Sequence, residues 1–176
     1  VFWAATLVER QAGVATADAT LVGSAFLAGM VAGRLMLSSG RAAAANPHRL
    51  VAAGLVVAIG GALVVWGSAL PLLSAAGLFC AGLGVAIQYP LGVAIALDAS
   101  AGRLGQAGAR LTIASGGAIL GAPLALGALA DTVGVVAGWA LIVVLGLAGL
   151  LVASLVRTDA RRRAAALPEA QAIAAD

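Results

Sequence analysis

Long apolar runs alternate with short polar segments along the chain. From residue 50 to residue 97 there is no Asp, Glu, Lys or Arg, and a window of that length holds two helices at about 20 residues per membrane span. Ser68 to Pro71 marks the turn between them, because proline is tolerated in the first turn of a helix but breaks a helix interior. The whole pattern predicts five full spans and one partial span, at residues 1–9 (partial), 16–39, 50–68, 71–97, 111–130 and 135–156.

The composition excludes an ordinary soluble domain. Hydrophobic residues make up 62% and charged residues 10% of the 176 residues, with a mean hydropathy of +1.10, whereas soluble domains carry about 25% charged residues. The 24 glycines lie inside apolar runs, where membrane helices use them for close packing. We therefore predict an all-α membrane protein, a polytopic helical bundle whose first partner is the lipid bilayer.

The basic residues indicate an orientation. All ten are Arg, and nine of them lie at residue 34, in the loops at 38–49 and 98–110, or after residue 155, whereas the opposite loops hold only Arg10. The positive-inside bias then predicts a multi-pass protein of the plasma membrane with a cytoplasmic C-terminus. Trp66 and Trp139 fall near the outer interface, where indole rings favour the headgroup level. Because the charge of +3 is explained in this way, we expect no nucleic-acid partner.

The two ends of the chain differ in character. The apolar stretch at residues 1–8 is too short to span a bilayer and lacks the basic region and cleavage site of a signal peptide. We interpret it as the end of a helix that starts before this sequence, which would then be a fragment. The tail at residues 158–176 is Ala-rich and basic, and we predict a disordered cytoplasmic segment.

Three segments resemble helices of the major facilitator superfamily of transporters. Residues 25–35 (AFLAGMVAGRL), followed by Gly40-Arg41, are similar to the eighth helix and the loop after it, although the Asp of the family pattern Gly-x-Leu-x-Asp-Arg-x-Gly-Arg-Arg is missing. Residues 77–84 (GLFCAGLG) with the later Gln-Tyr-Pro-Leu at 88–91 resemble the tenth helix. Residues 115–123 (SGGAILGAP) resemble the eleventh.

The resemblance covers nearly all of residues 1–157 and implies a function. It implies the C-terminal half of a twelve-helix secondary transporter, with helix 7 truncated and helices 8 to 12 present. In that family a small solute passes between two six-helix halves by alternating access, so the missing first six helices would be the main partner. Glu9, Asp98 and Asp131 all lie near span ends, which places a proton-coupling residue in the absent half or makes the protein a uniporter.

Gln88 is the main candidate for a substrate cavity. An amide at mid-membrane depth must find hydrogen-bond partners, because an unpaired polar group in hydrocarbon costs on the order of several kcal/mol. We expect Gln88 either to bind a polar substrate, with Tyr89 as a stacking wall, or to bond a neighbouring helix. Ser24 and Ser115 are expected to add hydroxyls to the same cavity or to bond the preceding turn of their own helices.

Other residues are candidates for gating. Pro90 loosens its helix so that the helix can bend. The resemblance implies that Asp98, together with Arg34 and Arg41, forms a latch at the cytoplasmic gate. The alternative is a set of interfacial charges without partners, because exposed ion pairs contribute only about 0 to 1 kcal/mol.

Two glycine pairs are candidates for helix packing. Both have the Gly-x-x-x-Gly spacing that lets helix backbones approach closely. The four residues are Gly29, Gly33, Gly117 and Gly121.

Other functions are weaker. No nucleophile, base and orienting group occur together, and buried His, Asp and Glu are scarce, so we expect no enzymatic activity, no cofactor and no metal site. The main alternative to a transporter is a standalone small membrane bundle with a structural or interaction role.

Overall fold

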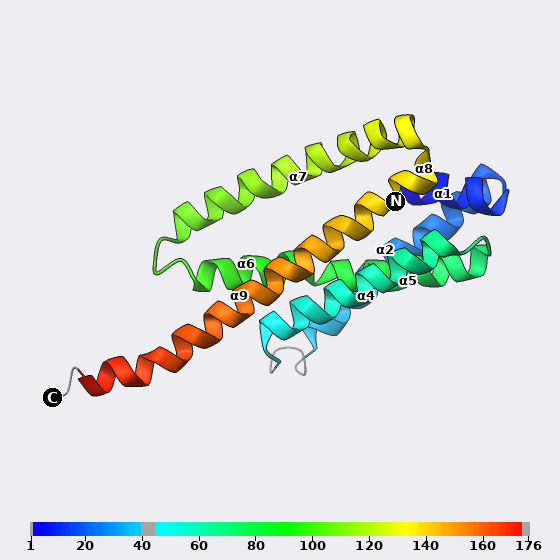
Figure 1. The fold of residues 1–176 in the computed structure, drawn as a ribbon. Helices are drawn as coiled ribbons and strands as arrows, with labels where there is room; N and C mark the ends of the chain where they lie inside the picture. Colours follow the sequence, from blue (N-terminus) through cyan, green and yellow to red (C-terminus); the bar gives the residue numbers. More distant parts are fainter. Residues whose placement is uncertain (1, 40–44, 174–176) are drawn as a thin grey trace.

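In the computed structural model, which describes residues 2–39 and 45–173, the described residues form helices and the connections between them (Figure 1). Five helical segments of this part are long and apolar enough to cross a membrane. The chain is therefore an all-α, multi-pass membrane bundle. The helices are α1 (Phe2–Ala12), α2 (Thr16–Ser38), α4 (Pro47–Gly67), α5 (Pro71–Ala86), α6 (Gln88–Asp98), α7 (Leu104–Val133), α8 (Val135–Gly138) and α9 (Ala140–Ile173).

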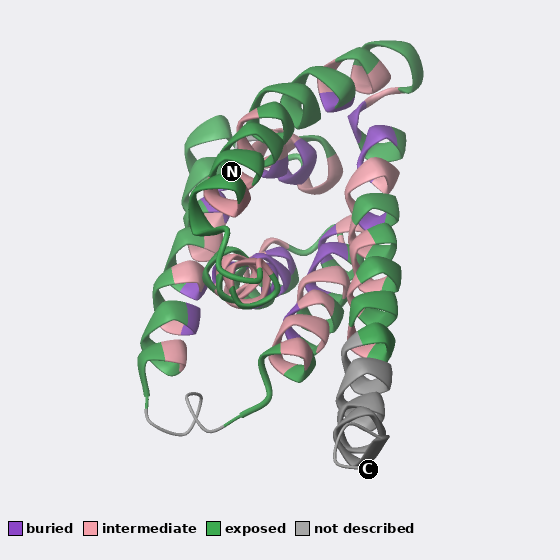
Figure 2. Cartoon of the chain, turned by 90° about the vertical axis from the view of Figure 1, so that its left-hand side faces the viewer, coloured by how far each residue is buried: buried purple, intermediate pink, exposed green. Residues whose placement is uncertain are grey.

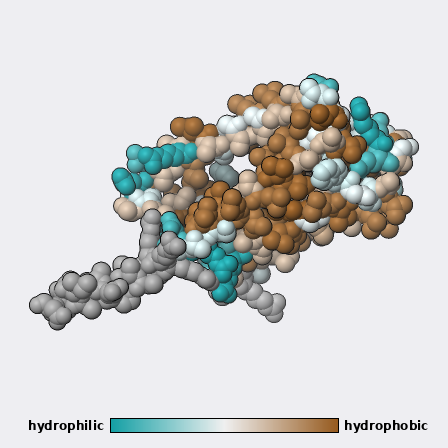
Figure 3. Space-filling view, in the orientation of Figure 1, coloured by the Kyte–Doolittle hydropathy of each residue, from teal (hydrophilic) through white to brown (hydrophobic). Residues whose placement is uncertain are grey.

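The helices run between two polar ends. The connections α2–α4 and α6–α7 and the C-terminal end of α9 lie at one end, and the connections α1–α2, α4–α5 and α7–α8 lie at the other (Figure 1). Hydrophobic side chains cover the middle of the face seen in Figure 3, and hydrophilic residues gather toward its ends. The loops in which the sequence concentrates arginine thus share one end of the bundle.

Two helices start earlier than the hydropathy pattern predicts. Helix α4 begins at Pro47 rather than at residue 50, because the Asn46 side chain accepts hydrogen bonds from the main-chain N–H groups of His48 (3.0 Å) and Arg49 (3.3 Å). Such a cap satisfies donors that the first turn leaves free. Helix α7 begins at Leu104 rather than at residue 111. In both cases the helix continues beyond its apolar stretch, which hydropathy alone cannot detect.

The C-terminal tail has helical main chain as far as the structure describes it. The main chain of α9 is helical to Ile173, whereas the sequence analysis predicted disorder from residue 158 onward. The physical reason is helix propensity, since Ala and Arg, which dominate this segment, are among the strongest helix formers. The tail therefore continues the last membrane helix as far as the structure describes it.

Helix α5 is the centre of the bundle and packs between α2 and α4. A Cβ atom on Gly29 of α2 would collide with the main-chain carbonyl of Phe79, and one on Gly82 of α5 would collide with that of Phe26. Between α4 and α5, Gly61 faces the Gly77 carbonyl in the same way. Glycine is required at these contacts because the backbones touch directly.

Helix α7 is less closely packed than the other long helices. Its contacts are mainly with α8 and α6, and Leu126 is its one buried residue. In Figure 2 the buried residues concentrate on the inward faces of the other helices, while α7 is exposed along most of its length. Large side chains of α7, such as Ile113, Ile119 and Leu124, are more than 70% exposed. The bundle is therefore open on the side of α7.

Candidate functional site

The third long membrane span, Pro71–Asp98, has a one-residue irregularity in its second half, at Ile87, where the backbone remains right-handed helical. We refer to this irregularity as the interruption. Helix α5 ends at Ala86 and α6 begins at Gln88, with Ile87 between them at φ −91° and ψ −13°. Pro90 has no N–H, so the carbonyl of Ala86 loses the donor that a continuous helix would supply. The next bond, from the Leu91 N–H to the Ile87 carbonyl, is 3.3 Å long. The sequence analysis predicted that Pro90 loosens this helix, and the interruption lies three residues before it.

Gln88 joins the interruption to the neighbouring helix. Its Nε2 donates hydrogen bonds to the main-chain carbonyls of Val51 on α4 (3.2 Å) and Gly84 on α5 (3.0 Å). Gly54 permits this approach, because a Cβ atom there would lie 2.6 Å from Nε2. Both amide hydrogens are used within the protein. The structure thus has the helix-bonding arrangement, and Oε1 is the part of this side chain that remains to accept a bond from a solute.

The two serine candidates also bond their own helices. Ser24 donates to the Leu21 carbonyl (2.6 Å), and Ser115 donates to the Thr112 carbonyl (3.2 Å). Ser and Thr hydroxyls in apolar helices commonly donate hydrogen bonds to carbonyls of the preceding turn. Ser24 lies exposed on α2 and Ser115 half-buried on α7, and neither lines a cavity described below.

A shallow cavity of about 440 Å³ gathers three of the candidates. It is lined by Arg34, Leu37 and Ser38 from the end of α2 and by Tyr89 and Pro90 directly after the interruption. The Tyr89 side chain is 63% exposed, so its ring is available to a ligand or to a partner. This cavity combines a cation, an aromatic ring and a hydroxyl next to the break in the span.

The latch candidates are only partly described. Arg34 and Asp98 are both exposed, and among the described residues no ion pair joins them. Arg41 lies outside the described residues. In this conformation the described pair is therefore open.

A second cavity, of about 320 Å³, lies inside the bundle and is almost entirely apolar. Trp139 is 5% exposed, and its Nε1 donates a 3.1 Å hydrogen bond to the Ala62 carbonyl. The sequence analysis missed this cavity, because its lining residues have the same apolar character as any helix core. Prominent members of the lining are Trp3, Phe26, Leu55, Leu78, Leu126 and Trp139.

The two glycine pairs have different surroundings. Gly29 and Gly33 lie against α5, and a Cβ atom on Gly33 would lie 2.6 Å from the Leu83 carbonyl. Gly117 and Gly121 on α7 have no atom of another described segment within 4 Å of such a position. The first pair packs helices within this chain, whereas the second pair is open.

The part of the chain that the structure describes holds no group of three His, Cys, Asp or Glu side chains that could bind a metal ion. No protein-family model, curated protein sequence or solved structure gives a significant match to the chain. The fold and these cavities thus define a multi-pass helical membrane protein with one interrupted span and one open side.

Proposed function

We propose that the chain is half of a secondary transporter, similar to the C-terminal half of major facilitator carriers, and that it moves a small solute across the plasma membrane by alternating access. The observation that carries the proposal is the interruption of the span at Ile87, beside the exposed Tyr89 ring and the Arg34 guanidinium. Interrupted spans in transporters supply freed backbone groups and polar side chains near the centre of the bilayer.

The depth of the interruption supports this function. Ile87 follows Pro71 by sixteen residues and precedes Asp98 by eleven. At 1.5 Å per residue, these distances are about 24 Å and about 16 Å along the helix axis. At such depth the Ala86 carbonyl, which Pro90 leaves without its helical donor, needs a partner from neighbouring protein or from water. The cavity lined by Tyr89 and Pro90 is therefore the proposed place for a solute.

The packing on the two sides of the interruption differs. Helix α5 is fixed between α2 and α4 by direct backbone contacts at Gly82 and Gly77. None of the residues of α6 is buried. A rigid segment followed by a loosely packed one is the arrangement that a gate requires, because α6 can tilt at Ile87 without disturbing the contacts of α5.

The open side of the bundle fits a second bundle as partner. Gly117 and Gly121 of α7 permit a close approach by another helix, and no described segment of this chain occupies that space. The proposed occupant is a six-helix N-terminal half, with the solute passing between the halves and the Arg-rich end of the bundle in the cytoplasm.

Cysteine labelling of the intact protein, expressed with any sequence that precedes residue 1, tests the proposal without knowledge of the solute. Cys80, the one cysteine of the chain, is first replaced by Ala. Tyr89→Cys is expected to react with a membrane-impermeant maleimide added from either side, because alternating access opens the site to each side in turn. The control, Val56→Cys, lies in the middle of α4 with 55% of the residue exposed. It is expected not to react, because a thiol in the hydrocarbon region is not reached by an impermeant reagent.

The alternative of a standalone structural bundle predicts a different result. In that case Tyr89→Cys reacts from one side at most. Labelling from a single side, in the presence and absence of an imposed ion gradient, would contradict alternating access.

A further inference from the structure

The hairpin between α6 and α7 borders an open cavity that the transport proposal does not use, and its lining combines alanines with four polar side chains. Its volume is about 400 Å³. The polar part of its lining consists of Ser100 and Arg103 from the turn and of Gln106 and Arg110 from the first two turns of α7, and alanines and Leu111 complete the wall. The cavity lies at the Arg-rich end of the bundle.

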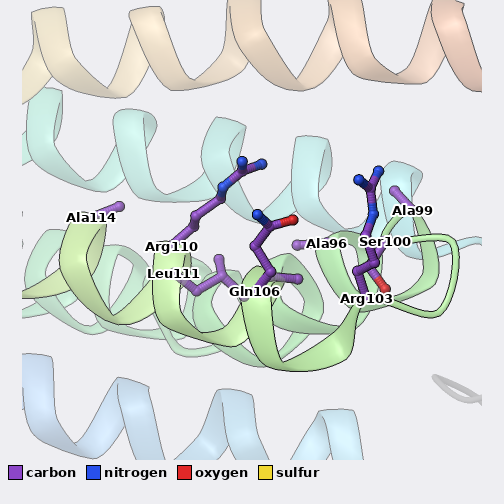
Figure 4. A pocket seen from close by; sticks show the side chains of 9 residues that line it. Ala96, Ala99, Ser100, Arg103, Gln106, Arg110, Leu111 and Ala114 are labelled. Atoms are coloured by element: carbon purple, nitrogen blue, oxygen red, sulfur yellow. The ribbon is translucent and has the colours of Figure 1, made fainter.

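The three long polar side chains share one face. Arg103, Gln106 and Arg110 are spaced by three, four and seven residues, and these spacings repeat on one side of a helix. Figure 4 shows all three side chains extending in the same direction, Gln106 and Arg110 from α7 and Arg103 from the residue directly before it, with the Gln106 amide between the two guanidinium groups. At 1.5 Å per residue, the two arginine positions are about 10 Å apart along the axis.

The donors of this cavity lack partners. Within residues 2–39 and 45–159, whose contacts are described, neither the Arg103 nor the Arg110 guanidinium forms an ion pair or a side-chain hydrogen bond. The Ser100 hydroxyl oxygen is buried and also has no hydrogen-bond partner among these residues. Arg103, Gln106 and Arg110 are exposed, so their donors are free to bind a ligand. Two cations beside a buried hydroxyl without a partner favour a ligand that accepts hydrogen bonds and carries negative charge.

The depth of the cavity in the bilayer indicates which class of ligand could bind there. Helix α7 starts at Leu104, and its apolar stretch starts at Leu111, so both arginines lie on the headgroup side of that stretch, with Arg110 directly before it. Basic pockets between membrane helices at this level bind phosphate-bearing headgroups. The planar guanidinium group also matches phosphate oxygens in a bidentate manner, which makes Arg better suited to phosphate than a point charge.

We propose that the α6–α7 cavity binds a phosphate group, with Arg103 and Arg110 on either side of it and with Gln106 and Ser100 as additional hydrogen-bond donors. The phosphate belongs either to an anionic lipid headgroup or to a soluble phosphate compound. A bound phosphate would tie the end of α6 to the start of α7. Because α6 has no buried residue of its own, this link would stabilise the hairpin.

The test measures the thermal unfolding of the full chain, purified in a neutral detergent. The probes are a phosphatidylglycerol, a phosphatidylcholine with the same acyl chains, and inorganic phosphate. The variant is Arg103→Gln with Arg110→Gln, and the matched control is Arg49→Gln with Arg157→Gln, which removes the same charge from residues that do not line the cavity. We expect the half-maximal lipid concentration for stabilisation to rise at least about tenfold in the variant and less than about twofold in the control, since each guanidinium supplies charge-assisted bonds.

The outcomes distinguish a lipid phosphate from a soluble phosphate. They also distinguish binding in the cavity from non-specific attraction of anions to the positive charge of the chain. A response to phosphatidylglycerol that the cavity variant loses supports the proposal with a lipid ligand. An equal response to inorganic phosphate, also lost in the variant, supports it with a soluble ligand. An equal loss in both double variants overturns the proposal, as does the absence of a response to both phosphatidylglycerol and inorganic phosphate.

A second double variant keeps the proposal testable if the Gln variant does not fold. Arg103→Lys with Arg110→Lys keeps both charges but loses the planar fork. If the Gln variant fails to fold by circular dichroism, the Lys variant is expected to bind more weakly than the wild type and to retain its helix content. Wild-type affinity in the Lys variant would overturn the role of the guanidinium groups.

Discussion

The indole Nε1 of Trp139 donates a hydrogen bond to the main-chain carbonyl of Ala62, which lies 77 residues earlier in the chain. Both residues are at most 5% exposed. The bond connects the residue before α9 to the last third of α4, and Trp139 itself belongs to the core cluster that includes Leu7, Val65 and Leu78. It therefore joins the last membrane helix to the packed part of the bundle.

Trp139→Phe removes this bond and part of a buried ring. We expect the free energy of unfolding in detergent to fall by about 1–3 kcal/mol, because a buried carbonyl loses a partner and a small cavity is left. Trp66→Phe is the control, since Trp66 is half-buried and only borders the same cluster. Denaturant titrations of the two variants compare them directly, and an equal loss in both would contradict the role assigned to the Trp139 bond.

Gly29→Ala inserts a methyl group against the main-chain carbonyl of Phe79. Because backbone cannot move aside as a flexible side chain can, we expect a loss of about 1–3 kcal/mol in the stability of the chain. Gly121→Ala introduces the same methyl group where nothing lies within 4 Å, so stability should stay unchanged or rise by up to about 1 kcal/mol from helix propensity. Thermal unfolding of the purified chain measures both values. Equal behaviour of the two variants would show that the α2–α5 contact is not as close as described.

The Gly-x-x-x-Gly pairs show which part of the helix packing the sequence alone predicts. The spacing of Gly29 and Gly33 is identical to that of Gly117 and Gly121, and it predicts a close approach without stating which helix approaches. Only the tertiary arrangement shows that α5 meets the first pair and that the second pair is open. The membrane spans were more legible, because the absence of charge from residue 50 to residue 97 is a strong and local signal.

Three other residues have tertiary contacts that sequence position does not show. Sequence position places Trp139 near the outer interface, and the residue lies beside the α7–α8 connection, at the end of the bundle opposite the Arg-rich loops. Sequence position does not show that the ring is buried or that its N–H bonds a helix carbonyl. Arg103 and Arg110 were considered only as topology signals. Their shared cavity depends on the turn between α6 and α7, which no periodicity encodes.

Gln88→Ala separates transport from packing. Gln88 bonds α4 through Val51, and Gln11 makes a comparable bond from its Nε2 to the Trp66 carbonyl at 2.7 Å. We expect Gln88→Ala and Gln11→Ala each to cost about 1 kcal/mol of stability. Under the proposed transport function, only Gln88→Ala should lower solute uptake by the intact protein at equal expression, by about fivefold, the equivalent of one hydrogen bond. Unchanged uptake would assign Gln88 to helix packing alone.

The orientation of the bundle can be tested at two exposed alanines. Ala45 lies in the α2–α4 connection at the Arg-rich end, and Ala69 lies in the α4–α5 connection at the other end. In a Cys80→Ala background, Ala69→Cys is expected to react with an impermeant maleimide on intact cells, whereas Ala45→Cys should react only after permeabilisation. The physical reason is that arginine-rich loops are retained on the cytoplasmic side during insertion. Because the two positions lie at opposite ends of the same helix, each serves as the control for the other, and the reverse pattern would place the arginines and the C-terminus outside.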